Sequence, residues 1–195
     1  MTGLLVSLRY ERLYFESNLE RDRLVVLDGS GMVRRLGVQA GPYHYRAHGE
    51  WHEHFFDNVW EGHDGRIVFE SIRPETSSRI ADLRRILRRL SLDDPRLAGA
   101  EIRLVGRHDC PDWLVQRSHA VRCAWRRPDA EADEAMLGCL RGVGVTVRAS
   151  EAIRASGLGP AGLPAIARLS MTGLVEIAGI DRLNFDARVL AAPIH

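Results

Sequence analysis

Three carboxylates stand at positions where acidic side chains can assemble a metal site. Glu20 lies in an expected helix, Asp57 near the end of an expected strand, and Glu70 on the strand that follows. Mg²⁺ prefers hard oxygen ligands, and attack on a phosphodiester also needs a positive charge near the phosphate. A polar side chain and a cation, Ser71 and Arg73, follow the last of these acids. This spacing favours Mg²⁺-dependent cleavage of a phosphodiester.

The composition excludes several other mechanisms. The chain of 195 residues contains no lysine, so all 27 of its Lys+Arg residues are arginines, against 26 Asp+Glu and a formal net charge of +1. There can be no Schiff-base lysine, no pyridoxal-phosphate lysine and no P-loop lysine. A hydrophobic fraction of 45% and a charged fraction of 27% are typical of a folded chain. The near-zero net charge does not itself indicate a nucleic-acid binder, but it permits a local basic face.

The histidines lack the spacing of a zinc site. The histidines gather in one region, at His44, His48, His52, His54 and His63. Zinc needs three or four ligands that converge on one point, and no familiar ligand spacing is present. Solvated histidines in hairpins are therefore expected.

The cysteines and the hydropathy pattern bear on the compartment. The cysteines are odd in number, widely spaced and without a C-x-x-C pair: Cys110, Cys123 and Cys139. Such spacing indicates free thiols in a reducing compartment. No run approaches the roughly 18 apolar residues of a spanning helix, and the apolar start is too short for a secretion signal. We expect a cytoplasmic protein without a membrane partner.

The first two thirds of the chain predict an α/β domain, with a mixed sheet flanked by helices. Leucines at helical spacing predict a first helix over residues 11–27, which residues 28–31 end. Strand-like segments separated by glycine-containing turns follow, and then a helix with one apolar face that residues 76–78 can cap. The expected strands are 32–39, 43–47, 51–60, 66–72 and 101–105, with helices over about 80–90 and 111–126.

A composition shift predicts a boundary that divides the chain into domains 1–127 and 128–195. A helix, a turn, a second helix and a two-stranded wing are the order of a winged helix-turn-helix. The second domain is therefore expected to be a small winged helix. Its expected elements are a helix capped by Asp129, an extended piece at 145–147, helices at 150–155 and 163–171, and a hairpin of 174–177 with 182–185.

Four short motifs of the first domain resemble, in order and spacing, those of the TnsA-type transposase endonucleases of the PD-(D/E)XK restriction-endonuclease superfamily. The run E-S-N-L-E-R-D at 16–22 resembles the family's S-x-x-E helix. The segment 33–39 resembles a strand that ends in glutamine, although alanine replaces the proline that usually follows. H-F-F-D at 54–57 stands where the family has Y-x-P-D. D-G-R-I-V-F-E-S-I-R-P at 64–74 stands where it has a turn, a strand and an E-V-K-P-like end.

The resemblance covers about residues 10–127 and implies a restriction-endonuclease-like domain that cuts transposon-end DNA with Mg²⁺. It also implies a DDE transposase subunit and an AAA+ regulator as partners. Glu20 and Asp57 would be the metal ligands. Aligning the terminal proline puts Ser71 at the family's acid position and Arg73 at its lysine position, and leaves Glu70 on the opposite sheet face. Arginine stays protonated and cannot act as a base, but it can stabilise phosphate charge.

Two other functions fit the same residues. A catalytically inactive nuclease fold would bind DNA or a partner protein, and a winged-helix transcription regulator would carry an α/β sensor domain. Taken alone, the arginines of one helix indicate a solvated face, and whether the winged helix binds DNA or protein stays open. Beside a nuclease-like core, the arginines expected to contact the DNA backbone are Arg84, Arg85, Arg88, Arg89, Arg117, Arg122 and Arg168.

Overall fold

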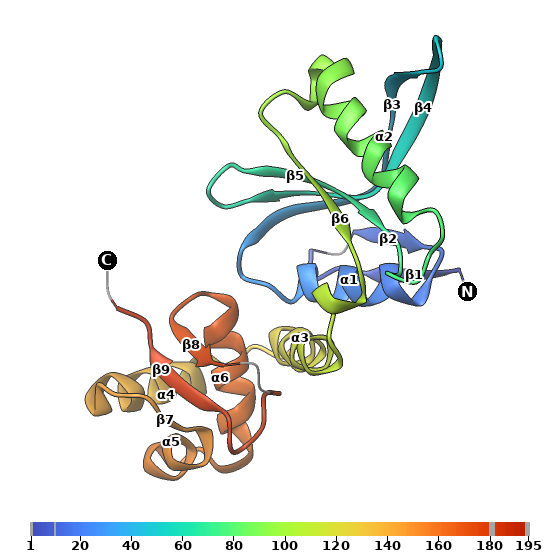
Figure 1. Ribbon diagram of the computed structural model, residues 1–195. Coiled ribbons are helices and arrows are strands. Elements are labelled where there is room, and N and C mark those ends of the chain that lie inside the picture. Colours follow the sequence, from blue (N-terminus) through green and yellow to red (C-terminus); the bar gives the residue numbers. More distant parts are fainter. Residues whose placement is uncertain (1, 10, 180–181, 194–195) are drawn as a thin grey trace. The chain divides into compact units, whose positions relative to one another are not determined.

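The structure is a computed structural model, and it describes residues 2–9, 11–179 and 182–193. The chain divides into two compact units, which are coloured blue to green and yellow to red in Figure 1. The first unit comprises Met1–Leu27 and Met32–Cys110, and the second comprises Asp28–Gly31 and Pro111–His195. None of the helices in the described part of the chain has the length and apolar character needed to cross a membrane.

The division between the units falls before the predicted boundary at residues 127 and 128. The helix α3 (Asp112–Trp125), expected in the first domain, belongs to the second unit. It packs on α6 (Gly162–Met171), where Val121 and Ala124 contact Ala167. The composition of the chain therefore changes after α3, whereas the division between the two units comes before α3.

The first unit is a mixed α/β layer. Its central sheet has the strand order β3-β4-β5-β6; the first three strands are antiparallel, and β5 and β6 run parallel with α2 between them in the chain. The predicted mixed sheet with flanking helices is confirmed. The elements are β1 (Gly3–Val6), β2 (Arg12–Phe15), α1 (Asn18–Asp28), β3 (Val33–Ala47), β4 (Glu50–Gly62), β5 (Ile67–Ile72), α2 (Ile80–Asp93), η1 (Pro95–Leu97), β6 (Glu101–Val105) and η2 (Arg107–Asp109).

The helix predicted over residues 11–27 is wrong in its first part. Residues 12–15 form β2, which pairs antiparallel with β1, and α1 begins only at Asn18. Leu13 and Phe15 are buried while Arg12 and Tyr14 are exposed, which is the alternation of a strand. The two strands expected at 32–39 and 43–47 are one long strand, β3, with a register irregularity between Ala40 and Tyr43.

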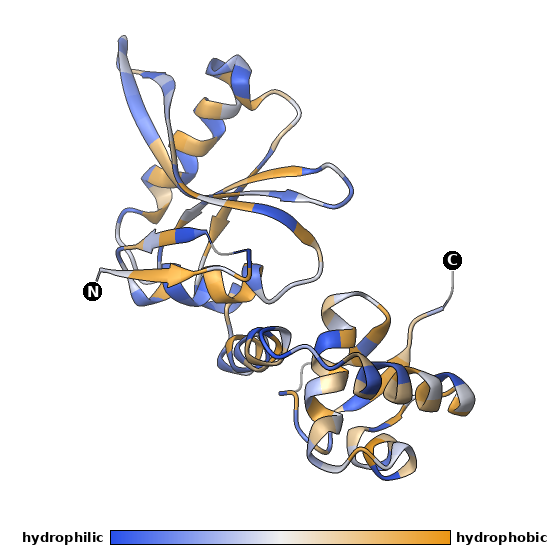
Figure 2. Cartoon of the chain, turned by 180° about the vertical axis from the view of Figure 1, so that it is seen from behind, coloured by the Kyte–Doolittle hydropathy of each residue, from blue (hydrophilic) through white to orange (hydrophobic). Residues whose placement is uncertain are grey.

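The core of the first unit lies on both faces of the sheet. One cluster contains Leu24 of α1 and Trp60, and the other contains Phe56 with Leu87 of α2. Figure 2 shows hydrophobic and hydrophilic colours alternating along α2, as expected for a helix with one buried face. Phe56 and Trp60 are four residues apart on β4 and would share a face of a regular strand. Their side chains lie in different clusters, so the alternation changes between them.

The change in alternation falls at Asp57. Asn58 pairs with Glu70 on the α1 side of the sheet, whereas Phe56 already lies on the α2 side. On β3, the residue opposite Asp57 in this register is Gln39, which has φ 53. A positive φ is uncommon for a residue other than glycine and often marks a local constraint. Asp57 therefore lies where the side-chain alternation of both β3 and β4 shifts from one face of the sheet to the other.

The second unit combines helices with a three-stranded sheet of order β7-β9-β8. Asp129 caps α4, because its Oδ1 accepts from Ala132 N at 3.1 Å, as the sequence predicts. The last strand lies at 188–191 and not at 182–185, because Phe185 O accepts from Ser150 N at the start of α5. The elements after α3 are α4 (Ala130–Val143), β7 (Val147–Arg148), α5 (Ala149–Ser156), η3 (Gly159–Ala161), α6, β8 (Val175–Ala178) and β9 (Arg188–Ala191).

Candidate functional site

Glu20 is fixed at the start of α1 by hydrogen bonds of the helix N-terminus. Its backbone N–H donates to Ser17 Oγ at 3.2 Å, and that hydroxyl donates to Glu20 Oε1 at 2.8 Å. Glu16 N donates to Glu20 Oε2 at 2.8 Å. These bonds satisfy amides that a helix start would otherwise leave unpaired, so the S-x-x-E motif also works as a helix cap. Both oxygens of this buried carboxylate are therefore already engaged.

Asp57 lies where the pairing of β4 with β5 ends. The last pair of the ladder joins Asn58 to Glu70. Beyond it, Asp57 Oδ2 accepts from Ile72 N at 2.6 Å and thus replaces a backbone carbonyl. Arg73 Nη1 lies 3.6 Å from the same oxygen, and its side chain is half exposed. The acid and the cation expected in the site are therefore neighbours.

The pKa of Asp57 is raised to about 6. Burial is the main cause; the Ile72 amide and the Arg73 guanidinium act in the opposite direction, and the carboxylates of Glu20 and Glu16 add to the rise. Asp57 on β4 and the carboxylates near the start of α1 therefore share one electrostatic environment. The predicted metal ligands Glu20 and Asp57 lie within range of each other's charge.

Replacing Asp57 with asparagine is expected to stabilise the first unit at neutral pH. The folded-state pKa lies above the usual 3.8, so ionisation of this carboxyl weakens the fold as the pH rises from about 4 through 6. The shift corresponds to about 2–3 kcal/mol at pH 7. Asparagine keeps an oxygen that can accept from Ile72 N. Urea unfolding of both proteins should show a gain at pH 7 that disappears near pH 4, and a variant less stable at both values would contradict it.

Ser71, a predicted site residue, is paired with a histidine. The Ser71 hydroxyl and His54 Nε2 lie 2.8 Å apart, and the serine is buried. Burial, together with the charge of Arg73, lowers the pKa of His54 to about 4. The imidazole is therefore neutral at physiological pH. His54 belongs to the H-F-F-D motif but was not expected in the site, and its spacing from Asp57 gave no sign of a contact with Ser71.

Glu70 points to the opposite face of the sheet, in agreement with its phase in the strand. It forms a two-point ion pair with Arg23 of α1, with Arg23 Nε 2.9 Å from Oε2 and Nη2 on Oε1. Trp60 Nε1 donates to Glu70 Oε1 at 2.9 Å. The glutamate is fully buried, as is most of the arginine. The Glu70 carboxylate is therefore bonded within the core and cannot take the place of Ser71 in the predicted site.

The side chains of the predicted site do not fit the Mg²⁺ site that the resemblance implies. The described residues contain no group of three or more histidine, cysteine, aspartate or glutamate side chains that could hold a metal ion. Glu20 uses both oxygens at the helix cap, and Asp57 uses one on Ile72. The third position carries the hydroxyl of Ser71 and not a carboxylate. Hard anionic oxygen ligands are thus too few at this place.

The arginines of α2 are available to a partner. Leu83, Leu87 and Leu90 of this helix are buried, whereas the arginines face away from them and are exposed. Arg85 forms an ion pair with Asp82. Like charges four residues apart on a helix repel each other, and two such pairs occur here. The exposed group, called the α2 arginine stripe below, consists of Arg84, Arg85, Arg88 and Arg89.

Two of the arginines expected to contact DNA are instead structural. Arg122 is buried, and its Nε donates to Asp28 Oδ2 at 2.7 Å. Arg168 is buried on α6, where its Nε donates to Asp133 Oδ1 at 2.9 Å and its Nη1 to Arg127 O at 3.0 Å. This corrects the expectation for both residues, because a buried, paired guanidinium is not accessible to a phosphate. Sequence periodicity could not reveal acidic partners this far along the chain.

Arg117 is half-buried against the ring of Trp113, with its Cζ 5.3 Å from the ring centroid. Its Nη1 has no hydrogen-bond partner in the described part of the chain, and burial lowers the pKa of Arg117. The side chain is therefore held by an aromatic face and not by an acid. It stays a predicted DNA contact.

Comparison with known proteins adds no family assignment. No family model matches the chain, and no curated protein matches it.

Proposed function

We propose that this chain is a TnsA-like, nuclease-fold subunit that binds DNA through the α2 arginine stripe and does not cut it. The observation that carries the proposal is that the motif at the end of β5 has neither a free acid nor a lysine at the positions that the resemblance assigns to catalysis. Ser71 replaces the acid and is bound to His54, while Glu70 is committed to Arg23 in the core. Arg73 replaces the lysine and cannot serve as a base.

The fold supports a restriction-endonuclease-like first domain. One helix, three antiparallel strands, a second helix and a strand parallel to the third follow in the order α1, β3, β4, β5, α2 and β6. In such a domain the transposon-end DNA is the expected ligand, and a DDE transposase subunit and an AAA+ regulator are the expected partners.

For the second unit we propose contact with a partner protein. Its order α4, β7, α5, α6, β8 and β9 supports a winged helix, in which α6 would be the helix that reads DNA. However, Ala165 to Leu169 on α6 are all buried, and α3 covers part of the helix. A helix enclosed in this way offers few side chains to base edges.

A second candidate is the Mg²⁺-dependent endonuclease itself. It is favoured by the electrostatic coupling of Glu20 and Glu16 to Asp57, because neighbouring acids with a raised pKa are common at functional sites. The two candidates differ in a single measurable property, cleavage.

The test measures binding and cleavage in the same samples. The wild-type chain should bind a DNA duplex with an affinity that falls steeply with salt, and should leave a supercoiled plasmid intact in Mg²⁺. Asp57→Ala should bind equally well. Mg²⁺-dependent nicking by the wild type that is lost in Asp57→Ala would establish the endonuclease instead.

A restored variant tests the ancestry of the fold. Ser71→Glu combined with Arg73→Lys returns the acid and the lysine to the family's positions. If the frame is intact, this variant should nick the plasmid in Mg²⁺ while the wild type does not. Ser71→Gln combined with Arg73→Lys is the matched control, since it has a similar shape without the acid.

A further inference from the structure

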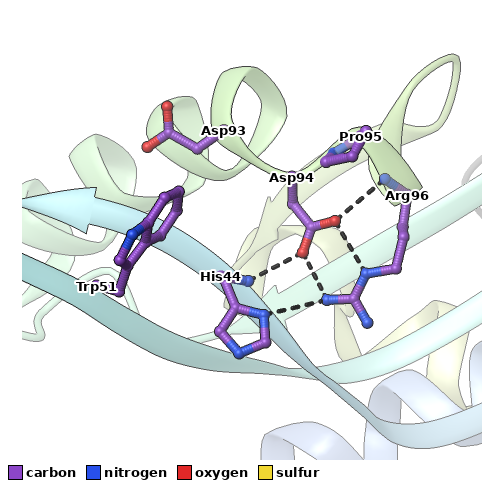
Figure 3. A pocket seen from close by; sticks show the side chains of 6 residues that line it. All are labelled: His44, Trp51, Asp93, Asp94, Pro95 and Arg96. Atoms are coloured by element: carbon purple, nitrogen blue, oxygen red, sulfur yellow. Dashed lines mark hydrogen bonds and ion pairs between the residues drawn. The ribbon is translucent and has the colours of Figure 1, made fainter.

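A groove in the first unit lies between the arm formed by β3 and β4 and the end of α2. Its volume is about 390 Å³. In Figure 3, Trp51 and Asp93 lie on one side of the groove, and the bonded pair Asp94 and Arg96 lies on the other. The lining residues are His44, Trp51, Asp93, Asp94, Pro95 and Arg96.

One side of the groove already holds an arginine. Arg96 Nε donates to Asp94 Oδ1 at 2.9 Å, and Arg96 Nη2 donates to Asp94 Oδ2 at 2.6 Å. The guanidinium carbon lies 4.6 Å from the centroid of the Tyr43 ring. A carboxylate and an aromatic face together thus bind a guanidinium within the chain itself. The charges of this pair cancel, so this side attracts neither anions nor cations strongly.

The other side presents the same two kinds of group. Arg46, which pairs with Trp51 across the two strands, donates its Nε to Gly49 O at 3.5 Å and not to Asp93. The Trp51 side chain is 63% exposed, which is unusual for an indole. Asp93 Oδ2 accepts from Arg46 N at 2.8 Å, and no described residue bonds to Asp93 Oδ1. Glu53, on the same arm, adds negative charge near His44, with Glu53 Oε1 3.6 Å from the ring. An open carboxylate beside an exposed indole favours a cation with a flat apolar surface.

We infer that the groove binds the guanidinium group of an arginine side chain from another protein. The guanidinium would lie over the Trp51 ring and donate to the Asp93 carboxylate, as Arg96 does with Tyr43 and Asp94. Arginine suits this place better than lysine, because its planar group both stacks on a ring and bonds in parallel to a carboxylate. This inference does not depend on the function proposed for the α2 arginine stripe.

The experiment follows the indole N–H signal of Trp51 by NMR while the blocked peptide acetyl-Gly-Arg-Gly-amide is added to the full chain. A saturable shift is expected for Trp51 and not for the buried Trp60. The same peptide with citrulline, which is neutral and has the same shape, should shift the signal little. Equal shifts with both peptides, or no saturable shift with arginine, would overturn the inference.

Two variants separate the groove from the general surface. Asp93→Asn keeps an acceptor for Arg46 N but removes the charge, and it should weaken peptide binding at least about threefold. Trp51→Leu should weaken binding by a similar factor, followed through the His44 ring signals. Phe55→Leu, which changes an exposed aromatic of the same arm outside the lining, should leave the affinity unchanged. Equal losses in all three variants would contradict the assignment.

Discussion

Glu70→Ala is expected to lower the free energy of unfolding of the first unit by about 3–5 kcal/mol. The substitution leaves the Arg23 guanidinium buried without the carboxylate that it bonds, and removes the acceptor of Trp60 Nε1. An uncompensated buried charge is costly because it has lost both water and its counter-charge. The effect is therefore much larger than the loss of one hydrogen bond.

Urea unfolding measured by tryptophan fluorescence tests this expectation. Replacing Trp113 and Trp125 with phenylalanine in all variants confines the signal to the first unit. Glu61→Ala is the control, because Glu61 pairs with Arg34 at the surface and should cost at most about 1 kcal/mol.

A double variant separates the pair's net contribution from the cost of breaking it. Arg23→Met with Glu70→Leu removes both charges and is expected to be more stable than Glu70→Ala, since apolar replacements of buried pairs are often neutral. It should remain below the wild type by about 1–3 kcal/mol, because Trp60 Nε1 still lacks its acceptor. A loss below about 1 kcal/mol in Glu70→Ala alone would show that Arg23 finds another partner or water.

Replacing the whole α2 arginine stripe with glutamine should reduce the affinity for duplex DNA at least about a hundredfold at low salt. Each arginine that neutralises a phosphate releases a counterion, so the slope of log affinity against log salt should become shallower by about 3 to 4. Titrations by fluorescence anisotropy at several salt concentrations give both quantities. The leucine face of α2 is untouched, so the fold should persist.

The matched control changes the same number of arginines in the same unit. Arg34, Arg35, Arg66 and Arg103 each form an ion pair with a glutamate or aspartate, and their replacement by glutamine gives the same net charge. This control should retain most of the affinity. If both sets reduce the affinity equally, the binding depends on net charge and not on α2.

Local patterns predicted the elements that have local causes. The strand at 101–105 and the cap at Asp129 follow from short runs of residues, and both are present. The orientation of Glu70 away from the site follows from the period of two in a strand. That argument needs only its phase relative to Ser71, and no knowledge of the partner.

Features with distant causes could not be predicted. The partner of Glu70 is 47 residues away, on α1, and the partner of Arg122 is 94 residues away. β2 was taken for the start of a helix because Leu13 also fits the helical period of the leucines that follow, and only pairing with β1 resolves this ambiguity. His54 could not be placed beside Ser71 from the sequence, because the change in strand alternation at Asp57 depends on the backbone.

The hydrogen bonds of Asp93 and Asp94 have a consequence beyond the groove. β3 is an edge strand, and the outward amides of His44 and Arg46 are covered by these two carboxylates. An edge with free amides is where an extended segment of a second molecule can add a strand. At these two residues the arm is therefore closed to intermolecular sheet extension, so the aspartates oppose aggregation as well as shaping a binding surface.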